Sequence, residues 1–521
     1  QQLEGTTVTL FKMGEPEVPT VHEFLKDKLT EGMCLGFDGR CVSAAETEEL
    51  KSLLADKNIR FSVEEDLIGE IWKNRPELSC EPVMELEEKW AGKSRADKCA
   101  QIREKMAEKG ADAFILTSLD DIAWLLNIRG NDIHCCPVVL SYLVMTQDEI
   151  LLFANEKAFD AAVRTSLEKD GVVLKPYNDI YQYVKTVPEN RTVLLSRKSA
   201  NSRLVSSLPE SVKVLDEENL TLLPKAIKNP VEVENERIAH IKDGVAVTKF
   251  IYWLKKNVGK TTITELSEAD HLFSLRKEQE NFLDNSFDPI VSYAGHAAIC
   301  HYSPSPETDI PLEPHGLALC DTGGHYLEGS TDITRTVVLG PVTEKEKKYF
   351  TLVLKGHLNL AAAKFRYGCT DLNLDYIARE PLWQLGEDYN HGTGHGVGYL
   401  GNIHEAPIGF RWKATRDAMC EIEPGMVITN EPGIYIEGSH GIRIENELLV
   451  RAGEKNEYGQ FLYFEPLTFV PIDLDALRPE LMTEEEKQLL NAYHQSVYEK
   501  ISPYLEAEEK EWLKEYTRPV K

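Results

Sequence analysis

Several features are scarce in this sequence, and each scarcity excludes a class of protein. None of the ten cysteines lies in a CxxC pair, and in a chain of 521 residues they do not suggest a disulfide framework. The longest apolar stretch, about 135–146, is too short to span a bilayer. No signal peptide, internal repeat or low-complexity segment is recognised. We expect reduced, mostly buried thiols in a cytoplasmic protein that does not bind membranes.

Basic residues are also few relative to acidic ones. Lys and Arg number 58 against 86 Asp and Glu, which gives a formal net charge of −28. Binding to phosphate backbones needs a basic surface, so nucleic acid is excluded as the main partner. Hydrophobic residues make up 42% of the chain, enough for sizeable cores. At roughly 150 residues per domain, the length predicts about three domains.

The order of the expected elements divides the chain at two points. Residues 1–88 alternate expected strands (7–13, 33–39, 59–65) with helices (20–29, 45–57), an α/β pattern that ends in a Pro- and Glu-rich linker. A second α/β domain covers 89–228. The third region, 229–521, opens with a capping box at Asn229-Pro230-Val231-Glu232 and ends in a polar helical tail.

The third region contains an unusual segment, "HGTGHGVGYLGNIHEAPIGF" at 391–410. Its first fourteen positions hold His391, His395 and His404 together with five glycines. Glycines at alternate positions weaken a strand unless something approaches its backbone closely. This segment alone does not decide what makes that approach.

Acidic residues interrupt apolar strands in the same region. Asp321 and Asp332 lie in an expected hairpin at 316–340, and Glu431 ends the apolar strand in "MVITNEPGIYI". In "GIRIENELLV", Arg443, Glu445 and Glu447 share one face of a strand. Carboxylates buried close together repel one another, and a cation removes that cost.

Each acidic residue also has a simpler explanation. Asp321 alone would be a turn former, Glu431 part of an ordinary turn, and Glu445 a partner of Arg443 or Arg335. The histidines alone would be satisfied core residues. Their coincidence in one region favours a metal site. Four carboxylates and one imidazole favour Mn²⁺, Co²⁺ or Mg²⁺, in a pair about 3.5–4 Å apart.

These motifs also resemble a known family. "CDTGGHYLEGSTDITRT", "HGTGHGVG", "NEPGIYI" and "GIRIENELLV" are similar to the pita-bread-fold metallopeptidases, and within them to aminopeptidase P, the X-Pro aminopeptidases. "ELEEKWAGKSRADKCAQIREKM", "AWLLNIRGNDI", "KAIKNPVEVENERIAHIKDGVAVTKFIYWL" and "AAICHYSPSPET" resemble its three-domain form. The resemblance implies an α/β fold class, with two creatinase-like N-terminal domains before an α+β catalytic pita-bread domain. Members of this form begin with a further βα stretch, so we expect the first domain to be N-terminally incomplete.

The resemblance also implies roles for particular residues. It makes the following five residues the ligands of two divalent ions, most often Mn²⁺: Asp321, Asp332, His395, Glu431 and Glu445. It assigns substrate binding to His301, His391, His404, Tyr435 and Arg443. The catalytic residues would be His301, His391, His404 and Glu431.

The expected activity is hydrolysis of the bond between an N-terminal residue and a penultimate proline. A hydroxide that bridges two metal ions would attack the carbonyl, with Glu431 accepting the water proton and His404 or His301 stabilising the oxyanion. Two alternatives stay open: a prolidase, which cleaves only dipeptides, and a non-catalytic peptide-binding homologue. A methionine aminopeptidase is disfavoured by the two preceding domains. The C-terminal tail resembles that of dimeric members, which predicts a homodimer.

Overall fold

The computed structural model describes residues 3, 5–414 and 420–521, and the chain forms two compact units. One unit combines Gln1–Pro82, Cys99–Ile122 and Leu140–Leu220. The other combines Val83–Lys98, Ala123–Val139 and Thr221–Lys521. The chain therefore passes between the units several times. No helix in the described parts of the chain is long and apolar enough to cross a membrane.

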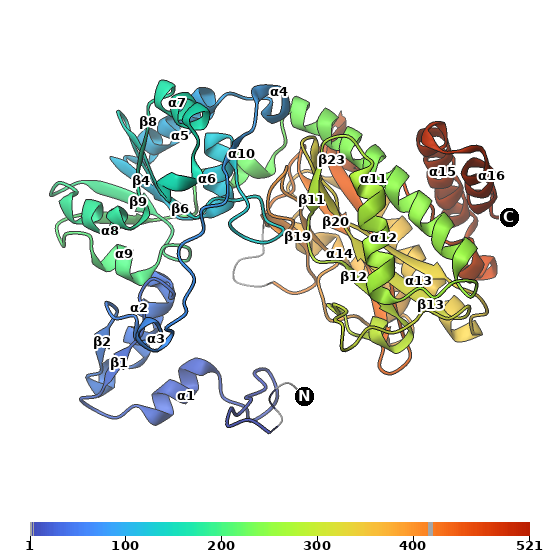
Figure 1. The fold of residues 1–521 in the computed structure, drawn as a ribbon, viewed down its shortest axis with the longest axis horizontal. Coiled ribbons are helices and arrows are strands. Elements are labelled where there is room, and N and C mark those ends of the chain that lie inside the picture. Colours follow the sequence, from blue (N-terminus) through green and yellow to red (C-terminus); the bar gives the residue numbers. More distant parts are fainter. Residues whose placement is uncertain (1–2, 4, 415–419) are drawn as a thin grey trace. The chain divides into compact units, whose positions relative to one another are not determined.

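The first unit is built on a mixed six-stranded sheet of order β10-β9-β4-β6-β7-β8. Helices α5 and α7 lie on one side of it, and α8 and α9 lie on the other (Figure 1). A separate parallel pair, β1 and β2, follows α1. The strands are β1 (Cys34–Gly36), β2 (Arg60–Ser62), β4 (Ala113–Leu116), β6 (Ser141–Thr146), β7 (Ile150–Ala154), β8 (Val172–Pro176), β9 (Thr192–Leu195) and β10 (Lys213–Asp216). The helices are α1 (Val21–Lys28), α2 (Ala44–Leu53), α3 (Leu67–Ile71), α5 (Arg95–Lys109), α6 (Leu119–Leu126), α7 (Ala161–Lys169), α8 (Ile180–Tyr183) and α9 (Ser202–Ser206).

Two expectations for this part of the chain were wrong. Residues 7–13, all described, form no strand, and Val8, Leu10 and Met13 are exposed. A strand needs a hydrogen-bonded neighbour, and none of the described strands pairs with this segment. The ten cysteines are all free thiols, but only Cys99 and Cys320 are buried.

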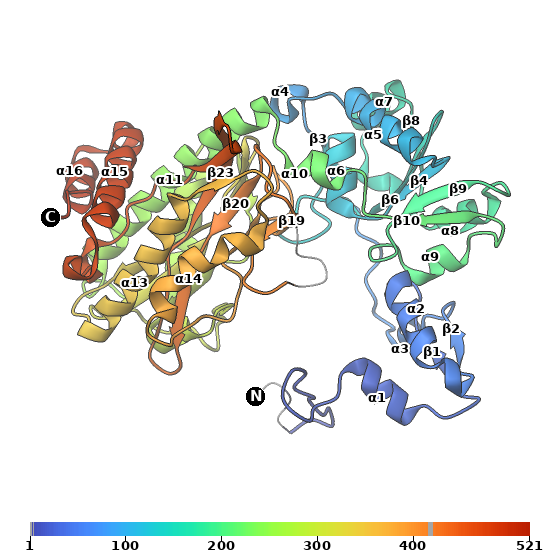
Figure 2. The same ribbon diagram turned by 180° about the vertical axis from the view of Figure 1, so that it is seen from behind.

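The second unit contains the long helix α11 (Pro230–Asn257), and its predicted cap is confirmed. The Asn229 side chain accepts hydrogen bonds from the N–H groups of Val231 and Glu232, and Glu232 accepts from the Asn229 N–H. Helices α11 and α12 lie on one side of the strands, and α13 and α14 on the other (Figures 1 and 2). The remaining helices are α4 (Glu88–Ala91), α10 (Leu222–Ala226), α12 (Glu265–Lys277), α13 (Glu344–Ala361), α14 (Asp375–Trp383), α15 (Glu484–Ile501) and α16 (Ala507–Tyr516).

Antiparallel strands fill the layer between these helices. Six form a sheet of order β17-β24-β23-β20-β18-β19, and two three-stranded sheets have the orders β12-β13-β16 and β11-β14-β15. The strands are β3 (Met84–Glu85), β5 (Ile128–Arg129), β11 (Phe282–Asn285), β12 (Ile290–Tyr293), β13 (Leu317–Thr322), β14 (Gly324–Tyr326), β15 (Gly329–Ser330), β16 (Ile333–Val338), β17 (Lys364–Arg366), β18 (Gly394–Gly396), β19 (Glu405–Phe410), β20 (Val427–Asn430), β21 (Gly433–Ile436), β22 (His440–Arg443), β23 (Asn446–Asn456) and β24 (Gly459–Pro466).

The hairpin expected at 316–340 consists of two pairs of strands that belong to different sheets. Strand β13 pairs with β16, and the short pair β14–β15 between them leaves that sheet to join β11. Asp321 lies in β13, while Asp332 lies just before β16 rather than inside it. Because Thr322 pairs with Ile333, the two aspartates still flank the same end of the ladder.

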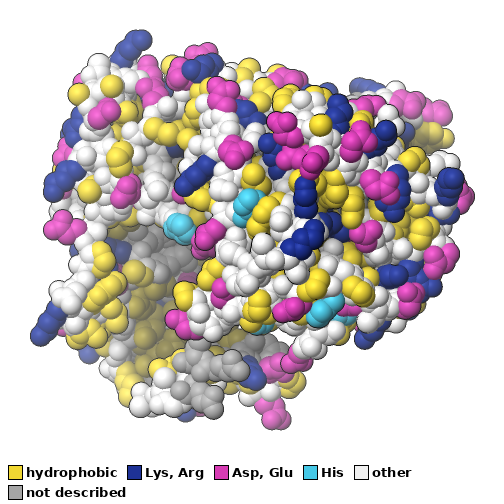
Figure 3. All heavy atoms as spheres, turned by 45° about the vertical axis from the view of Figure 1, so that its right-hand side comes forward, with side chains coloured by type: hydrophobic (Ala, Val, Ile, Leu, Met, Phe, Trp, Pro, Cys, Tyr) yellow, Lys and Arg dark blue, Asp and Glu magenta, His cyan; other side chains and the backbone are white. Residues whose placement is uncertain are grey.

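Charged side chains are mixed on the surface. Figure 3 shows acidic and basic groups intermingled over the face that it presents, with hydrophobic groups between them. On this face the net negative charge is therefore not gathered into one acidic patch.

Candidate metal centre and substrate pocket

A pocket of about 680 Å³ opens within the second unit. Its walls include nine of the ten residues that the sequence predicted for the site: His301, Asp321, Asp332, His391, His395, His404, Glu431, Arg443 and Glu445. The tenth, Tyr435, is not part of the lining but contacts two residues that are. The structure thus brings together side chains that are up to 144 positions apart, counted from His301 to Glu445.

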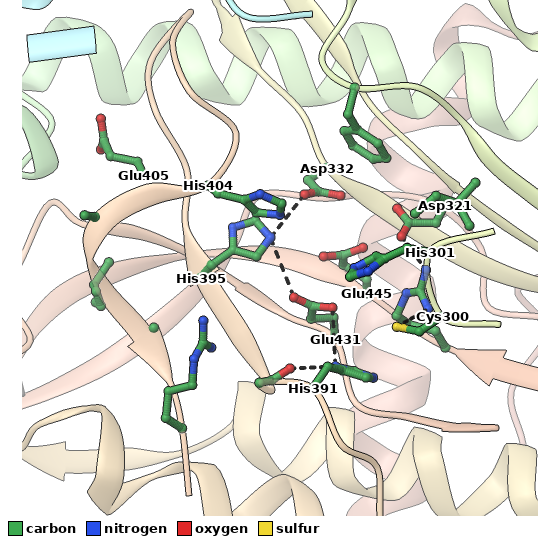
Figure 4. Close-up of a pocket in the computed structure, with 18 of the residues that line it drawn as sticks. Cys300, His301, Asp321, Asp332, His391, His395, His404, Glu405, Glu431 and Glu445 are labelled. Carbon is green, nitrogen blue, oxygen red and sulfur yellow. Dashed lines mark hydrogen bonds and ion pairs between the residues drawn. The ribbon is translucent and has the colours of Figure 1, made fainter. Parts of the chain in front are cut away.

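The five predicted ligands come from the ends of different strands. Asp321 and His395 lie in β13 and β18, and Glu431 directly follows β20. Asp332 precedes β16, and Glu445 lies between β22 and β23. In the close-up, the four carboxylates and the His395 ring converge on one space (Figure 4).

His395 presents one nitrogen to this space. Its Nδ1 donates to the Gly396 carbonyl at 3.0 Å, which leaves the Nε2 lone pair free to act as a ligand. Nε2 lies 3.4 Å from Asp332 Oδ2 and 3.6 Å from Glu431 Oε1. Donor atoms of Asp332, His395 and Glu445 all lie within 4.8 Å of one another.

The glycines around His395 let other parts of the protein lie close to this backbone. A Cβ at Gly394 would collide with the Thr429 carbonyl, and one at Gly396 with the Glu405 carbonyl. A Cβ at Gly392 would meet the Arg411 guanidinium. The close approach is therefore made by neighbouring strands and one side chain. This tight packing fixes β18, and with it His395.

The pocket disfavours the charged forms of three of its carboxylates, those of Asp332, Glu431 and Glu445. Burial, together with the neighbouring Asp321 and Glu431 carboxylates, raises the pKa of Asp332 well above its usual range. Burial and the Asp332 carboxylate do the same to the pKa of Glu445. Burial also raises the pKa of Glu431, although His395 and Arg443 oppose that shift. A cation at their centre would offset both burial and repulsion.

An unsatisfied oxygen points to the same conclusion. Asp321 Oδ1 is buried and accepts no hydrogen bond from any described residue. Asp321 Oδ2 pairs with Arg443 Nη2, and Glu445 Oε2 accepts from the Thr334 hydroxyl at 2.6 Å. The protein thus holds one oxygen of the Asp321 carboxylate and one of the Glu445 carboxylate in place. The donor set present here fits divalent cations that prefer oxygen ligands.

One wall of the pocket is a chain of hydrogen bonds. Arg443 Nη1 donates to the Tyr435 hydroxyl at 2.5 Å, and this hydroxyl lies 2.9 Å from His391 Nε2. The His391 Nδ1–H donates to the Gly392 carbonyl at 2.7 Å. The Tyr435 hydroxyl therefore donates to Nε2, and the imidazole is neutral. Burial, followed by the nearby Arg443 charge, lowers the pKa of His391 to about 3.

The two other predicted histidines lie on opposite walls. The His404 ring lies edge-on to His395, with centroids 4.3 Å apart. Burial, followed by the nearby His395 ring, lowers the pKa of His404 to about 4. His301 is exposed at the pocket wall, beside Cys300 and close to Glu445 (Figure 4).

Sequence reasoning did not assign two further acidic residues. Glu447 Oε1 accepts the Asp332 N–H at 2.6 Å and lies 3.2 Å from His240 Nε2, so it positions the Asp332 backbone. Glu447 lies two positions after Glu445, on the same face of an expected strand, and this spacing could have indicated that it lies near the site. Glu405 points away from the other carboxylates (Figure 4) and pairs with Lys225 and Lys228. That pairing anchors the segment carrying His404, and no local pattern revealed it.

Comparison with known proteins agrees with this architecture. Residues 74–232 match the Creatinase/Prolidase N-terminal domain, 234–452 match Metallopeptidase family M24, and 460–520 match the C-terminal region of peptidase M24. A probable Xaa-Pro aminopeptidase P of Coprinopsis cinerea is 37% identical, over 98% of this chain and 86% of that protein. Aminopeptidase P2 of Arabidopsis thaliana is 36% identical, over 100% of this chain and 78% of that protein.

Solved structures show the same likeness. The X-prolyl aminopeptidase of Caenorhabditis elegans, described as a cytosolic enzyme with a di-nuclear active site, superimposes with a TM-score of 0.92. It is 34% identical, over 98% of this chain and 85% of that one. The Xaa-Pro dipeptidase of Bacillus anthracis reaches 0.58 at 23% identity, over 73% of this chain and 99% of that one, a likeness of fold alone.

The fold and the pocket together define a class, the pita-bread metallopeptidases with a creatinase-like N-terminal region. The chain belongs to metallopeptidase family M24, among the relatives of Xaa-Pro aminopeptidase P. The predicted family and fold class are thereby confirmed.

Proposed function

We propose that this protein is a metal-dependent aminopeptidase that releases an N-terminal residue from peptides with proline in second position. The observation that carries the proposal is the pocket itself, where four carboxylates and one imidazole from five strand ends converge. The relatives named Xaa-Pro aminopeptidase P align along almost the whole chain, whereas the dipeptidase shares only the fold.

The five predicted ligands would hold two divalent ions: Asp321, Asp332, His395, Glu431 and Glu445. Asp332 and Glu445 would be shared between the ions. The oxygen-rich set supports Mn²⁺ as the metal, and the di-nuclear site of the C. elegans enzyme supports the number. When bound, such ions supply a water of lowered pKa and polarise the scissile carbonyl.

The chain's own residues complete the chemistry. The bond before proline has no N–H, so a site for this substrate cannot recognise a backbone donor there. Glu431, at the pocket wall with a raised pKa, would accept the proton of the attacking water. His404 or His301 would donate to the developing oxyanion, and the fixed His391–Tyr435–Arg443 wall would hold the peptide.

The proposal is tested by substrate length. Initial rates of the Mn²⁺-loaded enzyme are measured on an X-Pro-Y tripeptide, the matching X-Ala-Y peptide and the X-Pro dipeptide. We expect the tripeptide to be cleaved fastest, and an Asp332→Asn variant to be the inactive control. Equal or faster cleavage of the dipeptide would identify a prolidase, and no cleavage of any peptide would identify a binding protein.

Three further properties belong to this proposal. We place the protein in the cytoplasm, since the C. elegans relative is described as cytosolic. We propose a homodimer because the C-terminal tail, which contains α15 and α16, resembles that of dimeric family members. We also propose a division into three domains that cover residues 1–88, 89–228 and 229–521.

A further inference from the structure

A second group of side chains that could hold a metal ion includes one residue of the pocket lining. His134 Nε2, Cys135 Sγ and a carboxylate oxygen of Asp288 lie within 4.8 Å of one another. Within the part of the chain that the structure describes, this group and the Asp332 cluster are the two that meet this criterion. His134 and Cys135 lie in the loop between β5 and β6, and Asp288 lies between β11 and β12. Asp288 also lines the substrate pocket.

The loop that carries the cysteine is held firmly. Cys135 adopts a left-handed backbone with φ of 55°. Its carbonyl accepts a hydrogen bond from Nε2 of the buried His325, at 3.1 Å, and His325 Nδ1 lies 2.8 Å from the Ser330 hydroxyl. The Cys136 N–H donates to the Ile133 carbonyl at 3.0 Å. Cys135 therefore sits on a preorganised turn, which lowers the entropic cost of placing its thiol at a ligand.

The distances between the donor atoms suit tetrahedral coordination of a metal ion. Metal–ligand bonds of about 2.0–2.3 Å place tetrahedral donor atoms about 3.3–3.7 Å apart. Cys135 Sγ lies 3.4 Å from His134 Nε2, within this range. His134 Nε2 and Asp288 Oδ1 are 2.8 Å apart and would separate slightly. Both side chains are largely exposed, at 73% and 69%, so they are free to make that adjustment.

The donor types separate this group from the catalytic pocket. A thiolate and an imidazole select soft or borderline ions such as Zn²⁺, whereas the carboxylate-rich centre suits Mn²⁺. We propose that His134, Cys135 and Asp288 bind one Zn²⁺-like ion and that its presence narrows the substrate pocket. This site goes beyond the proposed peptidase activity, since none of its residues belongs to the di-metal ligand set.

The surroundings of the Cys135 thiol favour its protonated form. Burial and the nearby Asp288 and Asp284 carboxylates raise the pKa of Cys135 to about 12. The thiol is therefore protonated at neutral pH, and an incoming cation must displace that proton.

The test uses Co²⁺ added to the Mn²⁺-loaded full chain as a spectroscopic probe. A thiolate ligand gives Co²⁺ a charge-transfer band in the near ultraviolet, which an oxygen- and imidazole-bound ion lacks. We expect the band in the wild type and its loss in Cys135→Ser. The matched controls Cys136→Ser and Cys300→Ser should keep it. His134→Ala should weaken binding at least tenfold while circular dichroism stays unchanged.

Zn²⁺ inhibition provides the functional readout. We expect added Zn²⁺ to slow cleavage of an X-Pro-Y peptide by the wild type at concentrations that leave Cys135→Ser unaffected. A band that persists in Cys135→Ser, or disappears in Cys136→Ser, would overturn the site. A band without any difference in inhibition would overturn the narrowing of the pocket. The band does not depend on turnover, so failure of the peptidase proposal would be seen separately.

Discussion

His395 and His404 are neighbours with different environments. Their rings are in edge-to-face contact, but only His395 Nε2 faces Asp332 and Glu431. His404 carries no ion-pair contact to a carboxylate among the described residues. The contact geometry favours His395 over His404 as a metal ligand, and we propose that His404 binds the substrate.

This assignment predicts the effect of His404→Ala. Bound metal should stay near two ions per chain, while kcat falls by about 10²-fold, the scale for losing one oxyanion donor. The matched variant His395→Ala should lose metal along with activity. Metal analysis and kcat on both variants check the prediction. Metal loss in His404→Ala would show that the two roles are reversed.

Asp332 should control both ions. Its carboxylate would be shared between them, and the amide of Asp332→Asn is a neutral, weaker donor. We expect both ions to bind less tightly, activity to fall by orders of magnitude, and excess Mn²⁺ to restore little. The fold should persist, because Glu431 and Glu445 can take up protons when the cations leave. Full metal content with normal turnover, measured beside circular dichroism, would contradict the di-metal assignment.

At the scale of elements, strand ends account for what the sequence could predict. Acidic residues at the ends of apolar strands are visible in a sequence, and the antiparallel sheets bring those ends together. Glu405 was missed because its partners Lys225 and Lys228 lie about 180 positions away, which no local pattern shows. The strand at 7–13 was predicted wrongly because alternation cannot reveal whether a partner strand exists.

The contact between α15 and the segment that follows β24 predicts a dependence of stability on pH. His494 is fully buried in α15, and its Nε2 accepts the Ile472 N–H at 3.1 Å. Burial, followed by the Arg335 charge, lowers its pKa to about 3. A lowered folded-state pKa means that the unfolded chain binds a proton first as the pH falls below about 6.5. The stabilisation present above pH 6.5 is therefore lost progressively towards pH 3.

For this residue alone the loss is about 1.4 kcal/mol per pH unit below the unfolded pKa. In His494→Gln, the side-chain oxygen can still accept from Ile472 but does not titrate. We expect this variant to show a shallower fall of unfolding free energy between pH 6.5 and 5 than the wild type. Denaturant unfolding at several pH values checks this. Identical slopes would mean that His494 does not titrate as described.

At the scale of the whole molecule, the predicted homodimer has a direct test. The chain has a mass of 58.9 kDa, so light scattering after size exclusion should report about twice that value. Deletion of the described tail 483–521 should reduce the mass to that of one chain if α15 and α16 mediate the contact. A full-length protein that runs as a monomer at micromolar concentration would contradict the prediction.

The central claim is that the four carboxylates and His395 hold two ions that the peptidase activity requires. The most direct measurement is the rate of X-Pro-Y cleavage as Mn²⁺ is added back to chelator-treated protein, with bound metal counted in parallel. Activity should be absent at first and should rise until two ions per chain are bound. Full activity in the metal-free protein, or a plateau with no metal bound to the chain, would contradict the account.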